Sequence, residues 1–132
     1  MKRYKDTAKS KAELIAKAAF DKKADDVVIM DLRKISTICD YFVIAGASST
    51  RRVKAIADNI RESLDLKEHR LWHIEGYNEA QWVVMDYSDA VAHIFYSPLR
   101  RFYDLERLWG DASLRHFIPA KQHTKRDVRR KN

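Results

Sequence analysis

The feature that most constrains the fold is a pair of apolar segments separated by a short polar link. Residues 81–86 and 90–96 are rich in valine, isoleucine and aromatic side chains, and the polar residues 87–89 lie between them. Two such segments predict the strands of a β-hairpin, so the chain must build a β-sheet. Pro98 then ends the second strand. Because its φ is fixed and it lacks an N–H, it suits the first turn of a helix, which we expect over residues 98–108.

The first strand of the predicted hairpin has two faces of different character. Side chains alternate along a strand, so Trp82, Val84 and Asp86 share one face. Val83 and Met85 share the other. An ionised carboxylate is rarely buried without a partner, so a face with both a tryptophan and an aspartate indicates a contact surface. Core packing of Trp82 is the alternative, since a helix can cover either face of a sheet.

The expected helix after the hairpin adds side chains that favour binding. Tryptophan, tyrosine and arginine dominate the binding energy of protein interfaces, and Arg101 and Tyr103 follow Trp82 closely in the chain. Phe102 and Trp109 are expected on the inner face of the same helix. The sequence therefore indicates a contact surface formed jointly by the hairpin and this helix.

The rest of the chain predicts further helices and strands around the hairpin. Ser10 and Glu13 form a capping-box pattern, which predicts a first helix over residues 11–22. Apolar residues recur at helical spacing within residues 53–64 and predict a second helix, which opens after Gly46. Short apolar segments predict three more strands, at residues 26–32, 40–45 and 71–74.

Length and composition fit one domain. The chain has 132 residues, of which 45% are hydrophobic and 34% charged, so it can bury a core without disulfides. The order of elements predicts an α/β fold with a mixed β-sheet of about five strands and helices packed on it. We expect a basic N-terminal segment at residues 1–10, the α/β domain at residues 11–112 and a mobile basic tail at residues 113–132.

Hydropathy and cysteine content suggest where the protein works. No apolar run approaches the roughly 20 residues of a membrane span, and the first residues lack the apolar region of a signal peptide. Cys39 is the single cysteine, which fits a reducing compartment and predicts an inert, packed thiol. We therefore expect a cytoplasmic protein with no membrane partner.

The positive charge belongs to the two ends of the chain. Residues 1–11 hold five basic residues and one aspartate, a net charge of +4, and residues 120–132 hold six basic residues and one aspartate, a net charge of +5. Because the formal net charge of the whole chain is +7, the body between these ends carries −2. A domain that binds nucleic acid directly usually has a basic face of its own. The body is thus suited to a basic protein partner, while the tail is compatible with contact to rRNA and equally with a solvated terminus.

Two patterns raise the alternative of a nucleotide-binding transferase. The loop from Gly46 to Arg52 has hydroxyls and arginines that could hold a phosphate, although glycine followed by serine is also an ordinary way to cap a helix. Such an enzyme also needs two carboxylates projecting together to hold magnesium. Asp86 and Asp89 lie three positions apart across the expected turn, and Asp31 stands alone in its strand. This spacing argues against catalysis.

The remaining candidates for chemistry favour structural roles. His73 and His93 lie on expected strands without a carboxylate or thiol at ligand spacing, so we interpret them as sheet residues. Trp72 is compatible with the core. We therefore assign no catalytic residue, no metal site and no cofactor.

Nine blocks of the chain form a linked pattern: Asp31-Leu32, residues 40–46, Ser48-Ser49, Arg51, residues 53–58, residues 82–87, Asp89, residues 93–95 and residues 101–109. In their order and spacing, these blocks resemble the iojap-like family of ribosomal silencing factors, RsfS. The resemblance covers about residues 26–111. Two departures are visible, because Ser88 stands where the family commonly has glycine and Ala47 where it commonly has threonine.

The resemblance implies a fold, a partner and a contact surface. Members have a nucleotidyltransferase-like α/β fold without known catalysis, and bind the large ribosomal subunit through ribosomal protein L fourteen. They thereby block joining of the small subunit and repress translation, are associated with large-subunit maturation, and are often homodimers when free. Leu105 would either touch the partner or support the helix from inside. The residues of this chain that match the family's contact surface are Trp82, Asp86, Arg101, Tyr103, Leu105 and, more weakly, Glu106.

Overall fold

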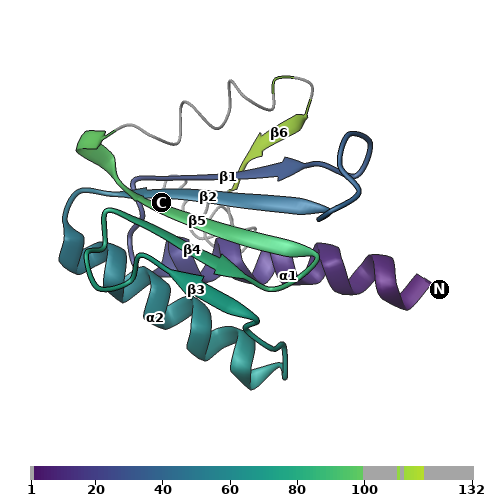
Figure 1. The fold of residues 1–132 in the computed structure, drawn as a ribbon, viewed down its shortest axis with the longest axis horizontal. Coiled ribbons are helices and arrows are strands. Elements are labelled where there is room, and N and C mark those ends of the chain that lie inside the picture. Colours follow the sequence, from purple (N-terminus) through teal and green to yellow (C-terminus); the bar gives the residue numbers. More distant parts are fainter. Residues whose placement is uncertain (1, 100–109, 111, 118–132) are drawn as a thin grey trace, which may run out of the picture.

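The computed structural model describes residues 2–99, 110 and 112–117 (Figure 1). Two α-helices, a short 3-10 turn and six strands follow one another along this part of the chain. In order they are α1 (Lys2–Asp21), β1 (Asp26–Asp31), β2 (Tyr41–Ala47), α2 (Thr50–Leu66), β3 (His73–Glu75), β4 (Trp82–Asp86), β5 (Ala90–Tyr96), η1 (Ser97–Leu99) and β6 (Ser113–His116).

The six strands form one mixed sheet in the order β3-β4-β5-β2-β1-β6. The central pair, β2 and β5, is parallel, and the four other pairings are antiparallel. A parallel pair needs a long crossover connection, and the chain between β2 and β5 supplies it with α2 and the strands β3 and β4. The predicted single α/β domain with a mixed sheet is confirmed.

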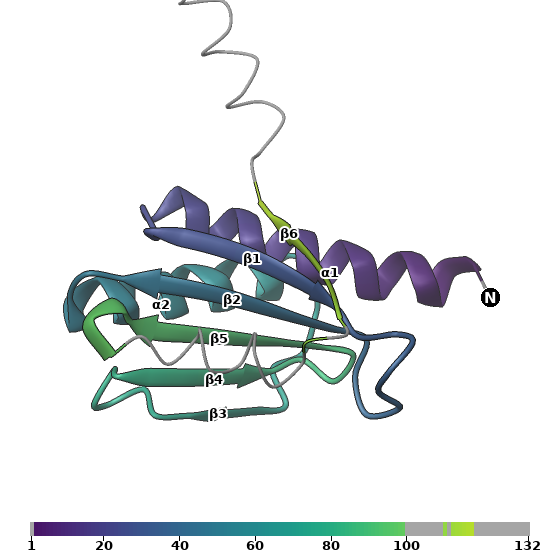
Figure 2. The ribbon, with the colours of Figure 1, turned by 90° about the horizontal axis from the view of Figure 1, so that it is seen from above.

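Both helices pack on the same face of the sheet (Figures 1 and 2). Ile15 of α1 and Ile56 and Ile60 of α2 are almost fully buried there. On the strands, Val43 and Ile94 belong to the same apolar cluster. A second, smaller cluster lies on the opposite face, and its buried members are Val28, Met30, Leu32, Cys39, Ile44 and Phe95. None of the described helices is both long and apolar enough to cross a membrane.

The first helix is longer than its sequence pattern predicted. It begins at Lys2, so Ser10 lies inside the helix and the predicted capping box is wrong. The apolar face continues beyond Ser10 to Ala8, which is only 2% exposed, and lysine and arginine are good helix formers. The helix thus extends into the segment expected as residues 1–10. The proposed boundaries at residues 10 and 112 stay predictions.

The sheet has one strand more than the five expected. Strand β6 pairs antiparallel with β1, and all four of its side chains are exposed. It therefore lacks the alternating apolar pattern that marks a strand in sequence. The third strand also lies further along than predicted, at His73–Glu75. Of the helix expected over residues 98–108, only η1 falls within the described residues.

The predicted hairpin is confirmed, and its turn contains a strained residue. Ser88 has a φ of +79°, in the left-handed region that favours glycine. Its backbone N–H donates to the Asp86 carboxylate at 2.7 Å, and the N–H of Tyr87 donates to the carbonyl of Ala90 at 2.9 Å. These bonds hold the turn in spite of the positive φ of Ser88.

We expect the substitution Ser88→Gly to stabilise the protein. Relief of the left-handed strain, about 1–2 kcal/mol, outweighs the added backbone entropy of glycine, about 0.5–1 kcal/mol, so the free energy of unfolding should rise by about 0.5–1 kcal/mol. Urea denaturation measures it. The control is Ser48→Gly, at an exposed serine without a positive φ, which should lower stability. A loss of stability in Ser88→Gly would contradict the strain.

Candidate functional site

The hairpin places Trp82 and Asp86 on the face of the sheet opposite the helices. Val83 and Met85 are fully buried in the cluster that includes both helices, whereas Trp82 is 38% exposed and Asp86 is half-buried. The two faces predicted for this strand are therefore confirmed. Across the strand pair, Trp82 lies opposite Phe95. Trp82 is therefore not part of the apolar core between the sheet and helices α1 and α2, and its role in a contact surface stays a prediction.

Trp82 is held from two directions while part of its ring stays accessible. The indole ring stacks on Phe95, with ring centroids 5.1 Å apart and planes inclined by 26°. The indole Nε1–H donates a hydrogen bond to Nδ1 of His93 at 3.1 Å. Aromatic stacking and a satisfied N–H are the usual requirements of a partly buried tryptophan. Trp82 is thus a rigid, partly exposed aromatic group.

His93 is a buried residue of the central sheet. It is only 6% exposed, and the ring of Phe42 packs edge-on against it at 4.5 Å. Its Nδ1 accepts from the indole N–H, so the proton of the neutral ring must be on Nε2. Burial lowers the pKa of His93 from its ordinary 6.5 to about 4. The ring is therefore neutral at physiological pH, as suits the structural role predicted for it.

Asp86 joins the surface at the end of β4. Its carboxylate accepts the N–H of Ser88, and its backbone carbonyl accepts the N–H of Trp72 at 2.8 Å. The neighbouring strand places His73 opposite Asp86, and His73 Nε2 lies 2.7 Å from a carboxylate oxygen of Glu75. Asp86 and His73 lie near the edge of the sheet, where solvent or a partner can reach them.

Trp72 was compatible with the core in sequence, but it is 60% exposed. The guanidinium of Arg70 lies over its ring, 4.4 Å from the centroid. β3 is an edge strand of only three residues, so no further strand covers the chain next to it. A short segment without clear alternation carries no signal that separates an edge strand from a buried one.

Gly76 sets the chain path into β4. Its φ is +79°, and a Cβ at this position would collide with the carbonyl oxygen of Trp82. Only glycine therefore allows the two backbone segments to approach this closely. The position of Trp82 at the start of the strand depends on this contact.

The loop from Gly46 to Arg52 is an ordinary helix start. Ser49 is the N-cap of α2, and its hydroxyl accepts the backbone N–H of Arg52 at 3.1 Å. The guanidinium of Arg52 donates to the carbonyl of Lys22 at 3.4 Å. A shallow hollow of about 400 Å³ borders this loop, with Lys22, Lys23, Arg51 and Arg52 among its lining. The capping explanation of the loop is confirmed.

The two carboxylates of the transferase alternative are not brought together. Asp89 lies 2.8 Å from Nζ of Lys11, which belongs to α1 on the helix-covered face. Asp86 belongs to the opposite face. Within the described ranges no group of three or more His, Cys, Asp or Glu is placed to hold a metal ion. Cys39 is buried, and burial raises its thiol pKa to about 11, which agrees with the inert thiol predicted.

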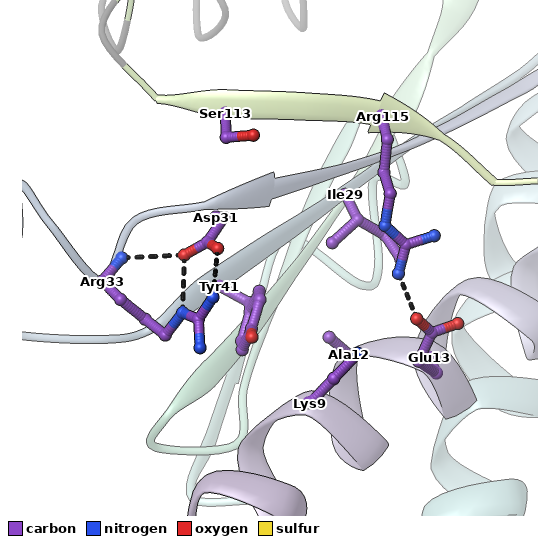
Figure 3. Close-up of a pocket in the computed structure, with 9 residues that line it drawn as sticks. All are labelled: Lys9, Ala12, Glu13, Ile29, Asp31, Arg33, Tyr41, Ser113 and Arg115. Carbon is purple, nitrogen blue, oxygen red and sulfur yellow. Dashed lines mark hydrogen bonds and ion pairs between the residues drawn. The ribbon is translucent and has the colours of Figure 1, made fainter.

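A second hollow, of about 190 Å³, lies between α1 and the strands β1 and β6 (Figure 3). Four of the five charged side chains that line it form ion pairs within the chain, and the fifth is Lys9. Arg33 binds both carboxylate oxygens of Asp31, at 2.9 and 2.6 Å, and lowers the pKa of that carboxyl. Arg115 of β6 pairs with Glu13 of α1. These pairs fasten β6 and the loop after β1, and they leave no obvious ligand role for the hollow.

Comparison with known proteins places the chain in a family. The profile of the family described as "Ribosomal silencing factor during starvation", RsfS, matches residues 5–132. The chain belongs to the RsfS family. The family suggested by the sequence motifs is thus confirmed.

Individual relatives agree with this family. The chain is 41% identical over 106 residues to a ribosomal silencing factor RsfS of Bacillus subtilis, covering 80% of this chain and 90% of the relative. It is 31% identical over 98 residues to a chloroplastic iojap protein of Arabidopsis thaliana, covering 74% of this chain and 41% of that protein. A crystal structure of a Chromobacterium violaceum protein superposes with a TM-score of 0.74 at 29% identity, covering 77% and 85% of the two chains.

Four of the predicted contact residues cannot be placed beside Trp82. Arg101, Tyr103, Leu105 and Glu106 lie outside the described residues, so their part in the surface of this RsfS member stays a prediction. Sequence reasoning missed the hydrogen bond between Trp82 and His93, because these residues are distant in sequence and only strand pairing makes them neighbours.

We expect His93 to make stability depend on pH. Its pKa is lower in the folded protein than the ordinary 6.5, so the unfolded chain takes up the proton first as pH falls. The contribution of neutral His93 to the free energy of unfolding is fully present above about pH 6.5 and is lost as the pH falls toward 4. The loss is about 3 kcal/mol, at about 1.4 kcal/mol for each unit of pKa.

Urea denaturation between pH 7 and pH 4 tests this expectation against His93→Asn, whose side chain does not titrate. Carboxylates contribute alike in both proteins, so the difference between the two pH profiles isolates His93. Parallel profiles would show that the histidine is not protected from protonation.

Proposed function

We propose that this chain represses translation by occupying the large ribosomal subunit and keeping the small subunit away. The observation that carries the proposal is a tryptophan on the face of the sheet opposite α1 and α2, 38% exposed and held by stacking and a hydrogen bond. Membership of the RsfS family, and the name ribosomal silencing factor borne by the Bacillus subtilis relative, support the choice of partner.

In this proposal the contact on the large subunit is ribosomal protein L fourteen. Trp82 is the aromatic anchor, and Asp86 pairs with a basic group of the partner. Arg101 completes the polar rim, and Tyr103 offers a flat face with a hydroxyl. Leu105 either touches the partner or supports its own helix, and Glu106 adds a weaker polar contact. The charge of −2 on the body between the basic ends suits a basic partner.

Occlusion requires bulk and affinity, and no bond is made or broken. A standard interface buries roughly 1,200–2,000 Å², which a domain of this size can supply. The chain would therefore act without catalysis or cofactor, in the cytoplasm, and as a homodimer when free of the ribosome. The basic tail at residues 120–132 would add screened contacts to rRNA.

We expect Trp82→Ala to bind purified large subunits about thirtyfold more weakly while remaining folded. Truncation of a central tryptophan costs about 2 kcal/mol or more of binding free energy. Co-sedimentation measures binding, and light scattering measures subunit joining. Leu66→Ala is the control, because Leu66 is 78% exposed at the end of α2. Unchanged binding of Trp82→Ala would remove this residue from the interface. Normal subunit joining at saturating protein would refute occlusion.

We expect Asp86→Asn to weaken binding about tenfold and to reduce its salt dependence. The amide keeps an acceptor for the N–H of Ser88 but loses the charge, and a hydrogen bond to a charged group contributes about 1.5 kcal/mol or more. Binding is measured at two salt concentrations. Glu62→Gln, at an exposed acid of α2, is the matched control. An equal effect of both substitutions would show that only net charge matters.

A further inference from the structure

The hydrogen bond between Trp82 and His93 determines which part of the tryptophan a partner can meet. The indole N–H is already donated to Nδ1 of His93 at 3.1 Å. It is therefore unavailable as a donor to a partner. One ring face stacks on Phe95. What remains accessible is the rest of the ring, which offers an apolar surface in a fixed orientation.

The acceptor is itself fixed in place. His93 lies on β5 opposite Val84, two pairs along from the pairing of Trp82 with Phe95. Its ring is 6% exposed and contacts the rings of Phe42 and Phe95, with centroids 4.5 and 6.3 Å away. Its other nitrogen, Nε2, is buried and has no hydrogen-bond partner among the residues that the structure describes. The bond to Trp82 is thus the one described polar contact of this ring.

Burying a polar ring destabilises the fold unless hydrogen bonds compensate for the lost hydration, so a histidine here needs an explanation. An apolar residue would fill the same space without burying a ring nitrogen that has no partner among the described residues. What it could not do is accept the indole N–H. The histidine therefore makes most sense as the group that orients the tryptophan.

We propose that His93 is a positioning residue, which holds Trp82 in the orientation that binds the partner. An immobilised side chain loses less conformational entropy on binding than one that must first be ordered. The inference rests on the proposed role of Trp82 in binding the large subunit. It goes further by naming a residue that does not touch the partner and yet sets the affinity.

The hydrogen bond can be observed directly in the free protein. In a ¹⁵N-labelled sample, an N–H···N bond gives scalar coupling between the two nitrogens, here Nε1 of Trp82 and Nδ1 of His93. We expect this coupling in the wild-type protein and its loss in His93→Gln. A wild-type indole without it would overturn the inference, whatever the result with ribosomes.

Two amide substitutions test the effect on binding. The amide of asparagine lies where Cγ and Nδ1 lie in histidine, so His93→Asn retains an acceptor for the indole N–H. The amide of glutamine lies nearer the position of Nε2, so His93→Gln keeps similar polarity but loses that acceptor. We expect His93→Gln to bind large subunits about tenfold more weakly, and His93→Asn to bind within about twofold of the wild type.

The outcomes separate this inference from the proposed function. If Trp82→Ala impairs binding but His93→Gln binds as the wild type does, Trp82 is an anchor and His93 does not position it. Equal losses in His93→Asn and His93→Gln would show a merely structural role and would also overturn the inference. If Trp82→Ala itself binds normally, the proposed interface fails, while the nitrogen coupling still reports whether the hydrogen bond exists. Thermal unfolding of each variant, followed by circular dichroism, verifies that it is folded.

Discussion

The structure depends on the packing of both helices against the same face of one sheet. Apolar side chains of α1 and α2 meet those of the central strands there, and this burial supplies the main driving force for folding. Because both described helices lie on one side, the other face of the sheet is not covered by α1 or α2. Around β1, β2 and β5 that face has a small apolar cluster of its own. At β4 it carries a tryptophan and an aspartate, and this difference along one face produces the candidate site.

The site combines rigidity with exposure. Trp82 could have been buried for stability or left free in solvent, and either choice would make it a poorer anchor. Stacking on Phe95 and the bond to His93 fix its ring, and Gly76 fixes the backbone at the start of its strand. The neutral, buried histidine makes this arrangement independent of pH through the physiological range. Such preorganisation suits the role in binding that we propose for Trp82.

The charged groups elsewhere mostly stabilise the fold. Lys11 bridges α1 to the hairpin turn through Asp89 and the carbonyl of Tyr87. Arg115 ties β6 to α1 in a similar way. Surface pairs of this kind contribute little each, but they link elements that are far apart in sequence. Asp86, Asp89 and Ser49, which could have suggested a nucleotide site, are engaged in the hairpin turn, an ion pair and a helix cap.

The sequence by itself determined the features that depend on local periodicity. The hairpin, the two faces of β4, the second helix with its serine cap and the mixed α/β class follow from spacings of two and 3.6 residues, and the family follows from short linked motifs. Only the tertiary structure decided the pairing of β6 with β1, the early start of α1, the exposure of Trp72 and the bond from Trp82 to His93. Each of these depends on what a segment packs against, and contacts between residues distant in the chain leave no local pattern to read.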